Sequence, residues 1–253
     1  MPPISAFIIA HDEVERIGPA LDSLAGVAHE VVVVDSGSTD GTQELARAKG
    51  ARVIHNDWPG YGQQKRFAEG QCRHRWLLNI DADERLTPAL AEEVRGLDLA
   101  ADGYEVLIRD RFFFEDEPRA GAYAYDPVRL YDREAGSYAD ETVHDRVTMK
   151  EGARIERLAG EIWHDSIPTL RFAIEKMNRY TDLQAQVLAE KGRRIGAGRL
   201  ALEFPVAFLK AYLGRRYLRY GAYGLILSTH YAYGRFARAA KRYEMQLAER
   251  RRR

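Results

Sequence analysis

The chain has 253 residues, of which 45% are apolar and 30% charged, a composition ordinary for a soluble globular protein with a substantial core. The single cysteine, Cys72, excludes a disulfide framework and a cysteine-rich zinc site, and it favours a cytoplasmic protein. No run of about 20 apolar residues occurs, so no segment is expected to span a bilayer. The apolar stretch at residues 4–10 is too short for a signal peptide.

The net charge of zero hides an uneven distribution along the chain. Residues 1–168 contain 19 Lys+Arg and 32 Asp+Glu, a net charge of −13, whereas residues 169–253 contain 19 and 6, a net charge of +13. A basic C-terminal region beside an acidic body suggests an anionic surface as partner. The alternative is that the two regions neutralise each other.

The first 55 residues alternate between predicted strands and helices. Residues 4–10 and 31–34 are typical of buried strands, and residues 52–55 indicate a third, shorter strand. Helical patterns separate these strands and end at Gly26 and Gly50. This order predicts an α/β fold with a parallel sheet and right-handed crossovers.

The loop at residues 35–42, Asp-Ser-Gly-Ser-Thr-Asp-Gly-Thr, has small residues and two glycines that let a ligand approach the backbone. Ser38 is one candidate cap for the helix that follows. Asp35 ends a strand, where its carboxylate could accept a hydrogen bond from the imide N–H of uracil. The loop lacks the glycine patterns of dinucleotide-binding folds and P-loop ATPases. An ordinary strand-to-helix turn is the alternative.

A second glycine-containing loop, at residues 57–64, leads into a helix that carries Lys65 and Arg66 near its start. We expect these cations and the N–H groups at the helix start to meet a diphosphate. A solvated basic pair is the alternative.

Residues 76–84, Trp-Leu-Leu-Asn-Ile-Asp-Ala-Asp-Glu, form a predicted buried strand followed by three carboxylates in four positions. Asp81, Asp83 and Glu84 would repel one another without a cation or strong donors among them. Carboxylate oxygens suit Mg²⁺ or Mn²⁺, which often bind substrate phosphates as well. The stretch therefore predicts a divalent metal that holds a phosphorylated substrate, although the acidic residues could instead cap the helix expected to begin at Pro88.

The remainder of the chain changes character near residue 169. Strands are expected at residues 103–109 and 127–131, and the pattern becomes helical from residue 169 onward. Residues 200–212 and 217–233 mix Leu, Ile, Tyr and Phe with Lys and Arg, a composition suited to a lipid interface. We expect peripheral contact with an anionic membrane there; packing on the rest of the chain or on a second subunit is the competing interpretation.

Four stretches together resemble the successive motifs of family 2 glycosyltransferases: Ala6–Glu13, Val33–Thr42, Gly60–Lys65 and Asp81–Glu84. The resemblance implies the GT-A fold, a nucleotide-binding α/β domain whose members transfer sugar from a nucleotide-sugar with inversion. It implies a catalytic domain at residues 1–168, with a nucleotide-sugar-binding half (1–100) and an acceptor half (101–168), and a helical region at 169–253. The implied nucleotide-sugar-binding residues are Ala10, His11, Glu13, Asp35, Ser38, Lys65, Asp81, Ala82 and Arg129.

A branch of this family that contains bacterial lipopolysaccharide-core β-1,4-glucosyltransferases is similar at Arg129-Leu-Tyr, at Val143-His-Asp145, at His164 and at the helix Lys176–Tyr180. Inversion needs one general base to take the proton of the attacking hydroxyl. The resemblance implies Asp145 in that role, although the family usually has Glu there. Glu141 and then Asp116 are the next candidates, and an ion pair with Arg146 or Arg129 is the structural alternative for Asp145.

Asp83 and Asp81 are the implied ligands of Mn²⁺ or Mg²⁺, with His164 completing the shell or lying in the core as a hydrogen-bonded residue. We therefore predict a metal-dependent inverting glycosyltransferase that moves a sugar, most simply glucose, from a UDP-sugar to a hydroxyl of a lipopolysaccharide-core or other cell-surface glycan or glycolipid. Transfer to a polyprenyl phosphate is one alternative, and a catalytically silent nucleotide-sugar-binding or scaffold protein is another. No nucleic-acid partner is expected.

Overall fold

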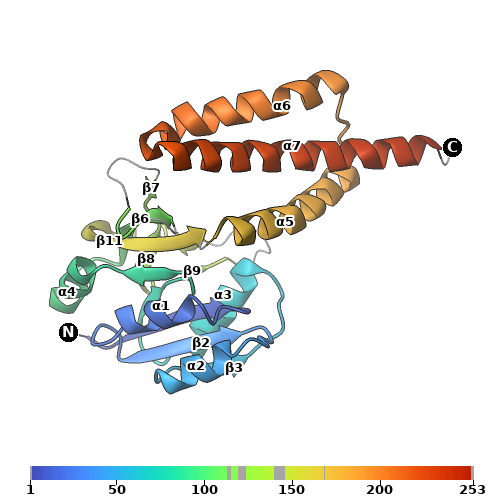
Figure 1. The fold of residues 1–253 in the computed structure, drawn as a ribbon. Helices are drawn as coiled ribbons and strands as arrows, with labels where there is room; N and C mark the ends of the chain where they lie inside the picture. Colours follow the sequence, from blue (N-terminus) through green and yellow to red (C-terminus); the bar gives the residue numbers. More distant parts are fainter. Residues whose placement is uncertain (1, 113–114, 119–123, 140–145, 168, 252–253) are drawn as a thin grey trace. The chain divides into compact units, whose positions relative to one another are not determined.

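The structure, a computed structural model, describes residues 2–112, 115–118, 124–139, 146–167 and 169–251. The chain divides into two compact units (Figure 1). Unit 1 comprises Met1–Asp110 and Ala124–Ser166, and unit 2 comprises Arg111–Tyr123 and Ile167–Arg253.

Unit 1 is built on a mixed sheet whose first half is parallel. Strands β3 (Arg52–His55), β2 (Glu30–Asp35), β1 (Ile4–Ala10) and β4 (Trp76–Asn79) lie next to one another in that order and run parallel. The sheet continues through β8 (Val128–Asp132), β6 (Gly103–Phe112), β11 (Ile155–Ile167) and β5 (Glu84–Leu86), with antiparallel pairing of β8 to β4, of β6 to β8 and of β5 to β11. The strand β7 (Ala124–Tyr125) pairs with β6, and β9 (Gly136–Tyr138) forms a separate hairpin with β10 (Val147–Met149).

Side chains of β1 alternate between two apolar cores, as the two-residue period of a strand requires. Ile4 and Ile8 pack in one core with residues of α1 (Ile17–Ser23) and α4 (Pro88–Gly96). Phe7 packs in the other with Ala68 of α3 (Tyr61–Gln71). Helix α2 (Thr42–Ala48) contributes Ala46 to the first core. Both faces of β1 are buried, which explains its continuous apolar sequence.

The expected α/β fold class is confirmed, and the strands expected at residues 4–10, 31–34 and 52–55 are present as β1, β2 and β3. The helix expected at Pro88 begins there, with the Thr87 hydroxyl accepting from Leu90 N–H at 3.2 Å. Strands β5, β9, β10 and β11 were not predicted. Their sequences are short or polar and lack the apolar runs from which the other strands were recognised.

Gly160 of β11 is required by the close approach of α4. A Cβ at this position would lie 2.4 Å from Leu90 Cα and 2.7 Å from Leu90 N. Because backbone atoms would have to move, Gly160→Ala is expected to lower the free energy of unfolding by about 1–3 kcal/mol in urea titrations. Gly96→Ala is the matched control, since a Cβ there meets nothing within 4 Å. An equal effect of both substitutions would contradict the packing explanation.

Unit 2 is helical. Helix α5 (Leu170–Glu190) is followed by α6 (Ala197–Leu209), which continues as the π-helix η1 (Lys210–Gly214); the 3₁₀-helix η2 (Tyr217–Tyr220) then leads into α7 (Ala222–Arg251). Helices α6 and α7 lie side by side and run in opposite directions (Figure 1). Within the part of the chain that the structure describes, none of the helices combines the length and apolarity needed to cross a bilayer.

Candidate active site

Strands β1, β2 and β4 run parallel, so their carboxyl ends meet at one edge of the sheet, where open α/β sheets bind ligands. Ala10 and Asp35 are partners at the ends of β1 and β2. Asp35 is fully buried, and its Oδ1 accepts from Gly37 N–H (3.0 Å), Ser38 N–H (2.9 Å) and Gln43 Nε2 (2.7 Å). The Ser38 hydroxyl donates to Oδ2. Asp35 therefore fixes the shape of its own loop, and contact with uracil stays a prediction.

The loops that follow β1 and β2 are joined to each other by hydrogen bonds. Asp12 N–H donates to Ser38 Oγ at 2.8 Å, and Glu13 N–H donates to Thr42 Oγ1 at 2.7 Å. Asp12 has a φ of 54°, which is uncommon for a residue other than glycine. The exposed His11 imidazole lies beside Asp12, at 3.7 Å. These bonds hold two segments of the predicted nucleotide-sugar site together.

Asp81 lies between two cations. Lys65 Nζ lies 2.8 Å from Asp81 Oδ1, and Arg129 Nη2 lies 3.4 Å from Oδ2. The buried Arg129 also donates to Glu84 Oε1 and to Asn79 Oδ1, both at 2.6 Å. Burial alone would raise the pKa of Asp81, but the charges of Lys65 and Arg129 outweigh burial and hold that pKa well below its usual value. Asp81 is therefore ionised.

Asp83 is the centre of a second charged group. Arg16 Nη1 lies 3.0 Å from Asp83 Oδ2, and His164 Nε2 lies 3.4 Å from the same oxygen. Arg16 also pairs with Glu13 at 2.5 Å. The other ring nitrogen of His164, Nδ1, lies 3.0 Å from Asp110 Oδ1. Asp83, His164 and Asp110 thus form a carboxylate–imidazole–carboxylate chain.

The pairing of β5 with β11 explains how His164 reaches Asp83. His164 is the register partner of Glu84, and Asp165 N–H donates to Asp83 O at 2.7 Å. Burial alone would lower the pKa of His164, but its bonds to Asp110 and Asp83 raise it well above the usual value. Burial would raise the pKa of Asp83, and the bond to His164 reverses this and lowers it.

Ala82 differs from its neighbours because its side chain belongs to the apolar core and is 4% exposed. Any ligand contact of Ala82 would therefore be made through its backbone. Because Ala82 is packed in the core, it fixes the backbone between Asp81 and Asp83.

The fit of a divalent metal can be judged from the side chains present. Among the described residues, no group of three or more His, Cys, Asp or Glu side chains is arranged to hold a metal ion. Asp83 and His164 nevertheless offer a carboxylate and an imidazole, and Asp110 holds the second ring nitrogen as carboxylates do for metal-binding histidines. Mn²⁺ accepts this donor set, with phosphate oxygens and water as further ligands.

The two predicted bases, Asp145 and Glu141, lie outside the described residues, so their role stays a prediction. Asp116, the third candidate, is exposed in unit 2. Arg16 and Asp110 were missed by the sequence analysis. Arg16 follows the motif at Ala6–Glu13 closely and could have been considered, whereas nothing local distinguishes Asp110 from the other polar residues of β6.

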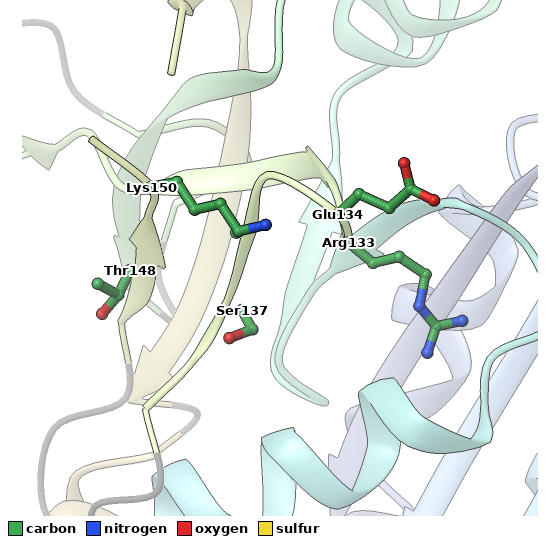
Figure 2. A pocket seen from close by; sticks show the side chains of 6 residues that line it. Arg133, Glu134, Ser137, Thr148 and Lys150 are labelled. Atoms are coloured by element: carbon green, nitrogen blue, oxygen red, sulfur yellow. The ribbon is translucent and has the colours of Figure 1, made fainter. Parts of the chain in front are cut away.

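A groove of about 440 Å³ lies along the β9–β10 hairpin and is lined by Arg133, Glu134, Gly136, Ser137, Thr148 and Lys150 (Figure 2). Figure 2 shows the Lys150 amine pointing toward the turn that carries Arg133 and Glu134. Arg66 of α3 donates to Ser137 Oγ at 2.8 Å and so links the hairpin to this helix. Arg133 and Lys150 are cations, Glu134 is an anion, and Ser137 and Thr148 carry hydroxyls, so the lining of the groove is polar.

Comparison with known proteins shows the family to which the chain belongs. Residues 5–160 match the family model described as "Glycosyl transferase family 2". The chain is 35% identical to "Lipopolysaccharide core biosynthesis glycosyltransferase LpsC" of Rhizobium meliloti, over 96% of this chain and 92% of the relative. It is also 35% identical to "Uncharacterized glycosyltransferase RP128" of Rickettsia prowazekii, over 98% of this chain and 89% of the relative. The crystal structure of S. aureus TarS 1–349 is similar at a TM-score of 0.47 and 16% identity, over 98% of this chain and 91% of the TarS 1–349 chain. The family model and these two relatives show that the protein belongs to glycosyl transferase family 2 and is a glycosyltransferase.

Proposed function

We propose that the protein is a metal-dependent inverting glycosyltransferase that transfers a sugar, most simply glucose, from a UDP-sugar to a hydroxyl of a lipopolysaccharide-core or other cell-surface glycan. The name of the Rhizobium relative supports this acceptor class. The observation that carries the proposal is the Asp83–His164–Asp110 chain beside the ionised Asp81. It supplies ligands for a cation next to the loops suited to a nucleotide.

In the proposed donor complex, Asp83 and His164 would hold Mn²⁺ or Mg²⁺, with Asp81 close by. The ion would neutralise the negative charge of the diphosphate as it leaves. Lys65 and Arg129 supply two further positive charges at Asp81. The joined loops at His11–Glu13 and Asp35–Ser38 bind the nucleoside, with Ala10, Ala82 and Arg129 in supporting positions.

Asp145 is the proposed general base, with Glu141 as the alternative. It takes the proton from the acceptor hydroxyl while that oxygen attacks the anomeric carbon and the bond to the diphosphate breaks. Residues 140–145 connect β9 to β10 in the sequence and lie outside the described residues. The acceptor is a glycan or glycolipid.

Residues 169–253, with a net charge of +13, are assigned to peripheral contact with an anionic membrane. Such contact would bring the enzyme to a lipid-linked acceptor.

Release of UDP from a panel of UDP-sugars, with and without Mn²⁺ and with a core oligosaccharide acceptor, tests the proposal. We expect acceptor-stimulated, Mn²⁺-dependent release from one sugar in preference to the others. A donor at about 100 times its Kd should add about 2.7 kcal/mol of stability in a thermal-shift assay. Binding and turnover with no requirement for a divalent ion would contradict the proposal.

Mn²⁺ affinity is expected to rise with pH. The raised pKa of His164 means that its Nε2 is protonated near neutral pH, and an ion must displace this proton to bind. Affinity should therefore increase as pH approaches the raised pKa and level off above it. Calorimetry in buffers of different ionisation enthalpy measures the proton released. His164→Gln should bind Mn²⁺ more weakly but with little pH dependence; an unchanged pH dependence in this variant would exclude His164 as a ligand.

A further inference from the structure

One face of α6 and η1 carries four large apolar side chains that remain exposed. Leu202, Val206, Leu209 and Leu213 are 62%, 61%, 54% and 57% exposed. They follow one another at intervals of four, three and four residues, which places them along one side of a helix. We refer to these four residues as the α6 stripe. Single exposed apolar residues are ordinary on protein surfaces, but a continuous row marks an interaction site.

The opposite side of α6 packs against α7. Glu203 of α6 pairs with Arg235 at 2.9 Å and Arg238 at 3.4 Å, both on α7. Ala207 and Ala211 are buried. The internal packing of unit 2 therefore uses a different side of α6, and the α6 stripe does not contribute to it.

A groove of about 370 Å³ lies beside the α6 stripe, and Leu202 and Val206 form part of its wall. Arg199, Lys210 and Arg235 also line this groove. Glu203 pairs with both arginines, but Lys210 has no ion pair within the described residues. The groove therefore keeps an excess of positive charge next to an apolar surface. An anionic phospholipid is complementary to both, because it has a negatively charged headgroup and apolar acyl chains.

The charge of the surrounding segment selects the partner. The cations that line the groove are Arg199, Lys210 and Arg235, and Glu203 is the one carboxylate among its lining residues. A second copy of this chain would bring the same excess of positive charge to the same patch in a twofold interface, and like charges would repel. An anionic bilayer offers both complementary charge and an apolar interior.

We propose that the α6 stripe docks the protein on an anionic phospholipid bilayer, with Lys210 and Arg199 contacting lipid phosphates. The four apolar side chains enter the boundary between headgroups and acyl chains, parallel to the membrane plane. This inference specifies the surface for the membrane contact assigned under the proposed function.

Co-sedimentation of the full chain with lipid vesicles tests the docking surface. Wild type is expected to bind vesicles of phosphatidylcholine with phosphatidylglycerol more tightly than vesicles of phosphatidylcholine alone. Leu209→Ser with Leu213→Ser should weaken binding by at least about tenfold. Lys210→Gln should weaken binding to the anionic vesicles by about fivefold and leave binding to the neutral ones unchanged.

Leu183→Ser is the matched control, because Leu183 of α5 is 60% exposed but adjoins the carboxylate of Asp182. An equal loss in this control, or equal binding of wild type to both vesicles, would overturn the proposal. The proposal would also be overturned if wild type self-associates in sedimentation velocity and the double variant Leu209→Ser with Leu213→Ser abolishes this self-association but still binds vesicles. The rate of UDP release from a soluble donor should be unchanged in all these variants. If wild type binds vesicles but releases no UDP, the result contradicts the proposed reaction and leaves the docking surface supported.

Discussion

Asp83→Asn is expected to lower kcat/KM for the UDP-sugar by about 10³-fold, because the substitution removes the carboxylate proposed to anchor the metal. The diphosphate would then leave without a neutralising cation. The Mn²⁺ concentration for half-maximal activity should also rise. Initial rates of UDP release across a Mn²⁺ titration measure both effects.

The matched control for this result is Asp126→Asn. Asp126 pairs with Arg157 at 2.8 Å on the surface of unit 1, so its loss should leave the rate unchanged. Because Asp83→Asn also leaves Arg16 with one carboxylate fewer, circular dichroism should accompany the kinetics. A folded Asp83→Asn variant that turns over like wild type and needs no additional Mn²⁺ would refute the role of Asp83.

Arg129→Met is expected to lower the free energy of unfolding by about 3–5 kcal/mol, the usual cost of removing one partner from a buried ion pair. Glu84 is 1% exposed and would lose its 2.6 Å contact with Arg129, and Asp81 would lose one of its two cations. Urea unfolding measures the change. Arg157→Met, which breaks an exposed pair, is the control and should cost about 0–1 kcal/mol.

The destabilisation by Arg129→Met should depend on pH. Burial raises the pKa of Glu84, and Arg129 opposes this effect. Without Arg129 the folded-state pKa rises further above the unfolded value, so stability is retained at low pH and lost as pH rises through the folded pKa. The cost should therefore be smaller at about pH 5 than at about pH 8. Arg129→Met with Glu84→Gln should recover most of the loss; a double variant as unstable as the single one would show that packing, not charge, is responsible.

Much of unit 1 could be predicted because the signals are local. Strands β1 and β2 are unbroken apolar runs, and β4 is buried along its length, so their positions follow from residues next to one another in the chain. The placement of Asp35 and Asp81 at strand ends follows from the same pattern. In contrast, β5 has three residues and is held by its pairing with β11, which no pattern within residues 84–86 indicates.

Lys65 illustrates the limit within the site itself. Its position near the start of α3 predicted contact with a diphosphate, but a sequence does not state which way a long side chain turns. In the structure the amine lies against Asp81 and over the ring of Tyr138, and the side chain is 1% exposed. Its positive charge is therefore engaged with the acidic residues of the site.

The sequence by itself determined the family, the alternation of strands and helices in the first 55 residues, and the position of the acidic residues after β4. Each of these three features depends on contiguous segments of the chain. Only the tertiary structure decided the partners of those residues. Asp83 meets His164 because β5 pairs antiparallel with β11, and His164 meets Asp110 because β11 and β6 are adjacent in the sheet. Strand order and register arise from packing across the whole sheet, so residues far apart in the chain come into contact at one site.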